Sequence, residues 1–240
     1  MKYSNFILLI LNFFDYFQQI KIIKFVKKKF FKPIVVFDIG AHYGETIKLF
    51  SKRLNIKKIY SFEASPLNFQ ILKKNISKSK SEKIKIFNYG AGEKISESFI
   101  NQTIESSSST INNLNLNSKY LERKLKILKI KNKDSFYKKI PIKIITLDYF
   151  IDKEGIENID LLKIDTEGYE LNVLKGLSKH SEKIKLVYFE HHYDDMIIKD
   201  YKFGQIHDLL KSYGFKKIKK SKMMFRKSFE YIYENKRFNN

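Results

Sequence analysis

A glycine turn and an acidic residue early in the sequence could together hold an adenosine-type ligand. The turn spans residues 40–44 and follows an apolar run, and Glu63 ends the next apolar run. Glycine lets the backbone approach a ligand closely, and an acid at a strand end can accept hydrogen bonds from both hydroxyls of a ribose. We expect Glu63 to hold the ribose. The expected contacts in the turn are Gly40, Ala41, His42 and Gly44.

An acid just before this turn narrows the choice of ligand. Asp38 precedes Gly40, close to where a dinucleotide fold binds pyrophosphate at a helix N-terminus. A carboxylate there repels pyrophosphate and favours a cation. S-adenosylmethionine has both ribose hydroxyls and a cationic amino-acid end, so we expect it, and not NAD, to be the cofactor. The alternative is that the turn merely joins a strand to a helix.

Acidic and histidine residues follow two later apolar runs and could serve a transfer reaction. Asp165 follows residues 159–164, and Glu190, His191 and His192 follow residues 185–189. Asp165 is the first candidate to orient an acceptor or take its proton, and the second set consists of Glu190, His191 and His192. Each could instead cap a helix or lie in a solvated loop, and for His192 we favour that interpretation.

An alternation of strands and helices would bring these residues together. Strands are expected over residues 34–37, 58–62, 84–88, 140–145, 159–164, 185–189, 215–219 and 229–233. Helices are expected over residues 45–54, 66–75, 147–152, 171–177 and 203–212. This order is typical of a parallel sheet built from right-handed strand–helix–strand units, whose ligands bind at the carboxyl edge.

Residues 93–139 fit this alternation least well and form an expected insert in a domain over residues 33–240. A short strand pair is predicted over 96–103, a polar loop over 106–110 and a Lys-rich helix over 116–133. The insert either covers the cofactor and shapes the acceptor pocket or is a surface loop.

Residues 1–32 are predicted to form an amphipathic helical extension. Leu9, Phe13, Tyr16, Ile20 and Ile23 recur near helical spacing, and polar residues interrupt the segment too often for a membrane span. We favour packing on the domain over peripheral contact with an anionic membrane. Because every motif lies after residue 33, a chain beginning near residue 32 should fold and bind cofactor, unless the helix supplies core.

Composition limits the remaining classes. The 240 residues are 43% hydrophobic, which excludes general disorder, and the absence of cysteine excludes disulfides and thiolate metal sites. A cytoplasmic location is compatible with that absence. The net charge of +21 would favour nucleic acid, but Arg53, Arg123, Arg226 and Arg237 are the only arginines among 47 basic residues. Since arginine is the preferred residue for phosphate and guanine, we expect no nucleic-acid partner. The sequence makes no prediction of oligomeric state.

Several motifs together resemble the FkbM family of S-adenosylmethionine-dependent methyltransferases. They are residues 37–44 (FDIGAHYG), 62–66 (FEASP), 106–109 (SSSS), 146–148 (TLD), 162–170 (LKIDTEGYE) and 189–190 (FE). The family commonly has Asn where this chain has His42. The resemblance implies a class I methyltransferase fold: a Rossmann-like, mostly parallel seven-stranded sheet with helices on both faces and an antiparallel last strand. It also implies cofactor contacts at Ala64, Gly90 and Ala91.

The resemblance further implies O-methylation of a sugar, glycan or other small-molecule acceptor. We predict metal-independent transfer, with Asp165 orienting the acceptor and His191 taking its proton. Magnesium held by Asp165 and Glu190 is the alternative. Two other functions stay open: an RNA methyltransferase, which the charge favours, and a protein that binds S-adenosylmethionine without catalysis. The sequence after Asp165 lacks the aromatic shelf that stacks a flipped base.

Overall fold

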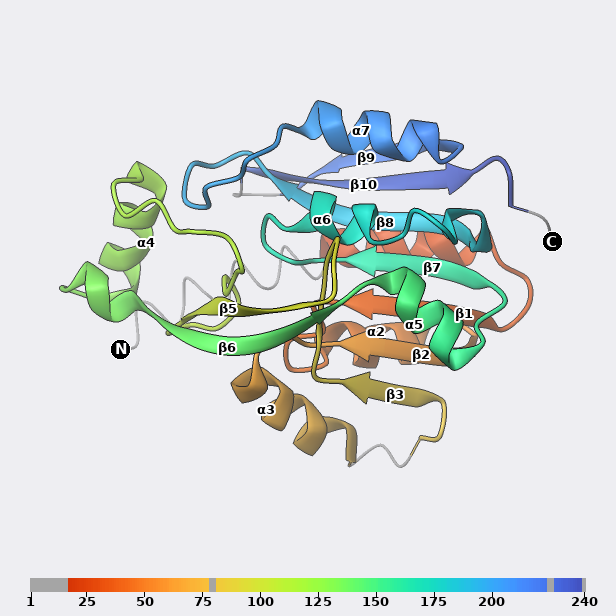
Figure 1. Cartoon of the computed structure of the whole chain (residues 1–240), viewed down its shortest axis with the longest axis horizontal. Coiled ribbons are helices and arrows are strands. Elements are labelled where there is room, and N and C mark those ends of the chain that lie inside the picture. Colours follow the sequence, from red (N-terminus) through yellow and green to blue (C-terminus); the bar gives the residue numbers. More distant parts are fainter. Residues whose placement is uncertain (1–16, 78–80, 224–226, 239–240) are drawn as a thin grey trace.

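A seven-stranded sheet forms the centre of the computed structural model, which describes residues 17–77, 81–223 and 227–238 (Figure 1). Its strands, in spatial order, are β3 (Ile84–Phe87), β2 (Ile56–Phe62), β1 (Ile34–Ile39), β7 (Ile159–Ile164), β8 (Ile184–His192), β10 (Ser228–Asn235) and β9 (Phe215–Lys222). The first five run parallel, and β10, the last in the chain, pairs antiparallel with β8 and β9. The predicted class I methyltransferase fold is confirmed.

Helices cover both faces of this sheet (Figure 1). One face carries α5 (Leu147–Glu154), α6 (Glu170–Lys175) and α7 (Phe203–Ser212), and the other carries a helix over residues 17–27, α2 (Glu45–Arg53) and α3 (Pro66–Ser77). Strand alternation supplies both layers: Leu162 packs into the first hydrophobic cluster and Leu161 into the second, both with no exposed surface. The βα units thus present their strand ends, and the residues that follow them, at one edge.

Local sequence explains where a typical helix begins and ends. The Thr146 hydroxyl accepts the Tyr149 backbone N–H at 3.1 Å and caps α5. Gly155 ends the same helix in the left-handed conformation at φ 62°. Two short 3-10 helices cover Lys133–Phe136 and Ser181–Lys183.

A second, three-stranded sheet consists of β4 (Gly90–Ala91), β6 (Tyr137–Ile145) and β5 (Ser96–Thr103), and only β5 lies wholly within the insert. The prediction of a strand pair over 96–103 is wrong, because these residues form one continuous strand that pairs along its length with β6. The predicted Lys-rich helix is shorter, α4 (Lys119–Leu128). Ser118 caps its start with a side-chain hydrogen bond, and Lys129 ends it in the left-handed conformation.

The helix over residues 17–27 contributes to the core. Ile22, Ile23 and Val26 are at most 4% exposed and pack in the cluster that also contains Phe50 of α2. The predicted helical positions Leu9, Phe13 and Tyr16 lie outside the described residues. A chain beginning near residue 32 would lack these core side chains. Since the helix does supply core, we expect such a truncated chain to lose stability. No helix within the described ranges is long and apolar enough to cross a membrane.

Candidate functional site

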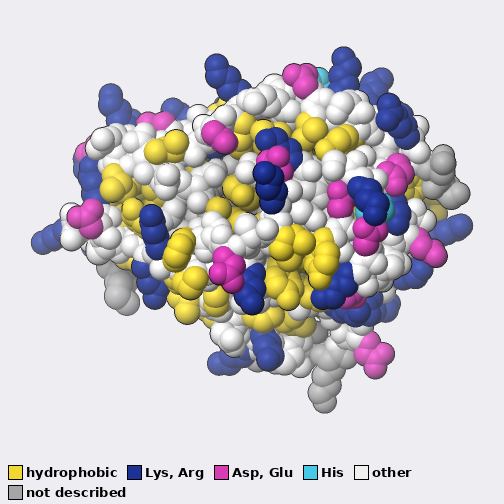
Figure 2. Space-filling model, viewed as in Figure 1, with side chains coloured by type: hydrophobic (Ala, Val, Ile, Leu, Met, Phe, Trp, Pro, Cys, Tyr) yellow, Lys and Arg dark blue, Asp and Glu magenta, His cyan; other side chains and the backbone are white. Residues whose placement is uncertain are grey.

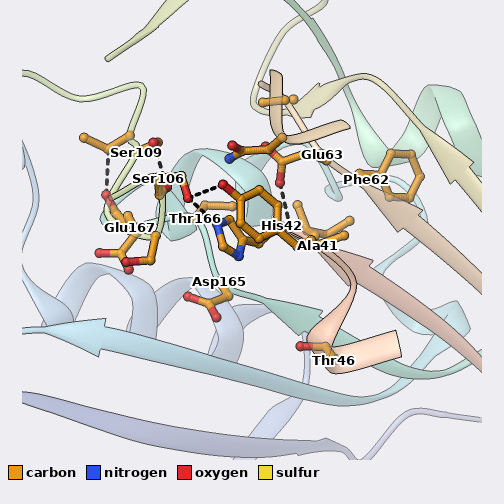
Figure 3. A pocket seen from close by; sticks show the side chains of 18 of the residues that line it. Ala41, His42, Thr46, Phe62, Glu63, Ser106, Ser109, Asp165, Thr166 and Glu167 are labelled. Atoms are coloured by element: carbon orange, nitrogen blue, oxygen red, sulfur yellow. Dashed lines mark hydrogen bonds between the residues drawn. The ribbon is translucent and has the colours of Figure 1, made fainter. Parts of the chain in front are cut away.

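A cavity of about 620 Å³ opens at the carboxyl edge of the large sheet, in the size range of small-ligand sites. Strand ends and the insert form its walls. Of the predicted residues, those lining it are Gly40, Ala41, His42, Glu63, Ala64, Gly90, Ala91, Asp165 and Glu190. Figure 3 shows side chains from these separate segments converging on one pocket. The carboxyl-edge location predicted from the alternation of elements is therefore where the cavity lies.

Glu63 is held by backbone groups at the end of β2. One carboxylate oxygen accepts the His42 N–H at 2.8 Å (Figure 3). The other accepts the Ser65 N–H at 2.9 Å. Burial raises the pKa of Glu63 to about 7, against the lowering effect of these N–H donors. A carboxylate has about four acceptor positions, so this fixed group retains capacity for ribose hydroxyls.

Small and apolar residues form the part of the cavity beside Glu63. Ala64, Tyr89, Gly90, Ala91, Ile100 and Ile111 line it. Ala64, which follows β2, and Gly90 of β4 lie close together, since a Cβ on Gly90 would be 3.5 Å from the Ala64 Cβ. An apolar slot next to a hydroxyl-accepting acid suits a planar base joined to a ribose.

The glycine turn brings β1 and β7 into close contact. Gly40 has φ +87°, and a Cβ there would lie 1.9 Å from the Asp165 carbonyl oxygen. Gly44 has φ +94° and precedes α2, but it does not line the cavity. The structure does not support the expected ligand contact of Gly44. A Cβ at this position would point toward Leu72 of α3, 3.0 Å away, and not into the cavity.

His42 links the turn to the insert. Its Nε2 lies 2.7 Å from the Ser106 hydroxyl, which donates to the Tyr43 hydroxyl at 2.8 Å (Figure 3). His42 and Ser106 both have positive φ, at 48° and 60°. Together with Ser107, Ser109 and Thr110, Ser106 lines the cavity. Of the two interpretations of the insert, the geometry supports the one in which it shapes the pocket.

Asp38 lies behind the cavity wall and does not line it. It is fully buried, 3.3 Å from the Lys163 ammonium, which lies 3.2 Å from the Asp165 carboxylate. Burial alone would lower the pKa of Lys163, but the two carboxylates outweigh it and raise that pKa above its ordinary value. The structure thus corrects the expectation for Asp38: its charge is matched by Lys163, and it supports Asp165 through that lysine.

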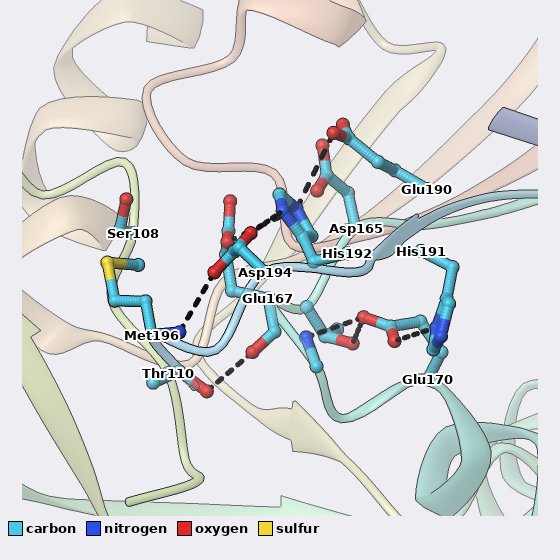
Figure 4. A network of polar contacts seen from close by, with 12 residues as sticks. Ser108, Thr110, Asp165, Glu167, Glu170, Glu190, His191, His192, Asp194 and Met196 are labelled. Carbon is cyan, nitrogen blue, oxygen red and sulfur yellow. Dashed lines mark hydrogen bonds and ion pairs between the residues drawn. The ribbon is translucent and has the colours of Figure 1, made fainter. Parts of the chain in front are cut away.

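Four further ionisable side chains form a cluster near Asp165. The His192 Nε2 lies 3.3 Å from a Glu167 oxygen and 3.5 Å from a Glu190 oxygen, and its Nδ1 lies 3.5 Å from Asp194 (Figure 4). Burial opposes a charged imidazole, but the carboxylates of Glu167 and Glu190 outweigh it and raise the pKa of His192 to about 10. Burial raises the pKa of Glu167 to about 7, although the nearby imidazolium lowers it. His192 is therefore a cation at neutral pH that holds two cavity-lining acids.

His191 lies on the opposite face of β8 from Glu190 and His192. It is 3% exposed, its Nδ1 lies 3.7 Å from Glu170, and its ring packs near Phe203 of α7 (Figure 4). Since successive side chains of a strand point to opposite faces, only alternate residues of this run can reach the cavity. The structure corrects the expectation that His191 takes the acceptor proton.

Three residues of this site were missed or undervalued from sequence. Lys163 interrupts an apolar strand, and such a charge in a buried run is a usable signal. Glu167 lines the cavity because its backbone adopts the left-handed conformation, at φ 50°. The sequence gives no sign of this conformation at a glutamate. His192 could have been separated from His191 by strand parity alone. The described residues contain no group of three or more His, Asp or Glu side chains arranged to bind a metal ion.

Comparison with known proteins gives one family match. The model of the methyltransferase FkbM domain matches residues 38–217. No curated protein matches the chain.

Solved structures share the fold at low sequence identity. A methyltransferase FkbM from Methylobacillus flagellatus KT superposes with a TM-score of 0.51 at 16% identity, over 84% of this chain and 44% of that one. A ribosomal protein L11 methylase from Lactobacillus delbrueckii subsp. bulgaricus gives a TM-score of 0.48 at 13% identity, over 88% and 74% of the two chains. TrmK of M. capricolum, bound to S-adenosylhomocysteine, gives 0.47 at 14%, over 91% and 69%. The chain spans less than half the length of the first of these proteins.

Proposed function

The chain belongs to the FkbM methyltransferase family, whose model matches residues 38–217. We propose that it is an S-adenosylmethionine-dependent methyltransferase and that it methylates a hydroxyl of an uncharged, polar acceptor such as a sugar, a glycan or a secondary metabolite. The observation that carries this proposal is the acidic wall of the cavity. Asp165, Glu167 and Glu190 all line it. Carboxylates accept hydrogen bonds from hydroxyls and repel the phosphates of a nucleic acid.

The residues of the cavity fit the cofactor. Glu63 is fixed by two backbone N–H groups beside an apolar slot, a donor and acceptor set suited to ribose and adenine. We assign Glu63 to the ribose and the turn at Gly40–His42 to the portion beyond it. When bound, S-adenosylmethionine supplies an activated methyl group on a sulfonium.

The chain's own contribution to transfer is alignment and a place for one proton. Asp165 projects from the end of β7, is held by Lys163 and is 35% exposed at its side chain, so it can accept a hydrogen bond from the acceptor hydroxyl and orient it. Glu167 then receives the proton, because its pKa of about 7 matches a general base at neutral pH. His192 is already protonated there and acts by holding Glu167 and Glu190 in place.

Methyl-labelled cofactor offered with a panel of acceptors tests the proposal. The panel contains neutral glycans, nucleotide sugars, small polyols and tRNA, and products are identified by the NMR shift of the new methyl group. We expect methyl ethers on hydroxyl compounds, with activity unchanged by EDTA. Label found only in tRNA would establish the nucleic-acid alternative. Cofactor binding with no transfer to any class would support the non-catalytic alternative.

A further inference from the structure

The exposed side of the helix over residues 17–27 carries a row of lysines. Lys21, Lys24, Lys27 and Lys28 are exposed, whereas Ile22 lies buried on the opposite side of the helix. Positions 21, 24 and 28 follow one another at the three- and four-residue spacing that keeps side chains on one helical face. We call these four lysines the basic stripe.

Carboxylates do not neutralise the basic stripe within the described ranges of the chain, where none of its four lysines forms an ion pair. Lysines elsewhere are often paired: Lys29 lies 2.9 Å from Glu234, and Lys126 lies 2.9 Å from Glu122. On the face of the molecule seen in Figure 2, basic side chains are scattered among acidic and apolar ones. The stripe is therefore a local concentration of positive charge and not only a share of the overall excess.

Neighbouring elements widen this positive surface. Lys48 and Lys52 are exposed on α2, which packs beside the same helix. The Lys219 ammonium of β9 lies 4.9 Å from the ring centre of Phe25. Lysines thus occur on two elements that pack beside the helix of the stripe, and the fields of charges within about 10 Å of one another add at ordinary ionic strength.

A large apolar side chain stands at one end of the stripe. Phe31 is 97% exposed and follows the run Lys27–Lys29. At the other end of the same helix, Gln19 lines the cavity. In the sequence, the apolar run Phe6–Leu11 precedes this helix. Positive charge, exposed aromatic surface and adjoining apolar sequence thus coincide along one segment.

We propose that the basic stripe docks this methyltransferase on an anionic lipid bilayer, with Phe31 entering the headgroup region. Lysine ammonium groups near an anionic membrane contribute about 1 kcal/mol each, and an aromatic ring gains from leaving water at the lipid interface. An RNA partner would also satisfy the lysines, and one of its bases could stack on Phe31. The apolar run Phe6–Leu11 in the same segment favours lipid instead, because apolar aliphatic side chains gain nothing from RNA. Because Gln19 belongs to the same helix, docking brings the cavity beside the lipid surface.

Sedimentation of the full chain with vesicles tests the proposal without need of an acceptor. One vesicle set contains phosphatidylglycerol and phosphatidylcholine in equal parts, and the other contains phosphatidylcholine alone. We expect binding to the anionic set only, weakened by added salt. The variant K21Q/K24Q/K27Q/K28Q should bind at least about a hundredfold more weakly, as four lysines at that contribution imply. Phe31→Ser should weaken binding about tenfold, an effect that added salt does not remove.

A matched variant separates the stripe from total charge. K119Q/K126Q/K131Q/K139Q removes the same number of exposed lysines from the insert and should bind vesicles like the unaltered chain. Thermal unfolding and S-adenosylmethionine affinity should be the same in all variants. Equal losses in both fourfold variants would overturn the proposal in favour of a general charge effect. Affinity for tRNA that depends on the stripe, without vesicle binding, would overturn it in favour of nucleic acid.

Discussion

The two ends of the cavity are built in different ways. At the end that we assign to the cofactor, backbone groups position the residues: the N–H groups of His42 and Ser65 hold Glu63, and Gly40 permits close contact between β1 and β7. At the acceptor end, side chains hold one another, with Lys163 between two aspartates and His192 between two glutamates. A backbone-built site depends on local chain geometry, whereas a side-chain-built site depends on the balance of buried charges.

This difference predicts how each end responds to substitution. At the cofactor end, changes that alter the backbone should damage the fold. At the acceptor end, charge-removing changes that keep side-chain shape should leave the fold and the cofactor affinity but alter turnover and its pH dependence. Substitutions at Gly40, Asp165, Glu63 and His192 test that contrast.

Gly40→Ala should have the largest effect. Its Cβ would lie 1.9 Å from the Asp165 carbonyl oxygen, at a φ of +87° that L-residues rarely adopt. We expect the free energy of unfolding to fall by at least about 3 kcal/mol, measured by urea denaturation. Gly204→Ala is the matched control, because nothing lies within 4 Å of a Cβ there and α7 tolerates alanine. A Gly40→Ala protein as stable as that control would show that the turn can move, contrary to the backbone-built description.

Asp165→Asn should act on turnover and not on cofactor binding. Asparagine keeps the shape of the side chain but removes the charge paired with Lys163, so the acceptor hydroxyl loses its orienting carboxylate. We expect turnover to fall roughly a hundredfold, with S-adenosylmethionine affinity within about twofold of the unaltered chain. Asp200→Asn, at an exposed carboxyl outside the cavity, should change neither quantity. A large loss of cofactor affinity in Asp165→Asn would place this residue in the cofactor end instead.

Glu63→Ala should weaken S-adenosylmethionine binding by roughly 1–3 kcal/mol, measured by calorimetry. Because burial raises the pKa of Glu63 to about 7, this group holds its proton in the free protein at lower pH. The charged form accepts hydroxyl hydrogen bonds better, so affinity should rise as pH increases from about 6 to about 8.

Glu63→Gln provides the control for that pH dependence. It cannot ionise, so the part of the rise in affinity that belongs to Glu63 should disappear, while titration of Glu167 and Glu230, whose pKa values are also about 7, is retained. An identical pH dependence in the variant would show that another group is responsible.

Sequence patterns predicted the cofactor end better than the acceptor end, for a physical reason. Strand–turn–helix order is local, so the turn at 40–44 and the acid at Glu63 could be placed at one sheet edge from the sequence alone. Asp38 was misassigned because the chain does not reveal that a lysine from β7, far along the sequence, lies beside it. Ion pairs between elements depend on sheet order, which local patterns do not contain.

The insert and β8 show the same limit at smaller scale. Residues 96–103 alternate weakly, and the partner that makes them one strand is β6, about 40 residues later. Along β8, the predicted strand ended before Glu190, whereas the observed strand extends through His192. Once the strand includes these residues, alternation separates His191 from its two neighbours and turns its side chain away from the cavity.

His192→Gln and His191→Gln form the finest test of the contrast. Removing the His192 cation should raise the pKa of Glu167 further, because the imidazolium now lowers it. Since Glu167 must be ionised to take a proton, turnover increases with pH, and its midpoint should move upward by about one pH unit. At neutral pH this costs only several-fold in rate. His191→Gln lies on the other face beside Glu170 and should leave the midpoint unchanged even where it lowers stability. The measurement is the pH–rate profile of each variant, with an acceptor found in the panel. Equal shifts of the midpoint in both variants would mean that turnover responds to a general loosening of β8 and not to the charge of His192.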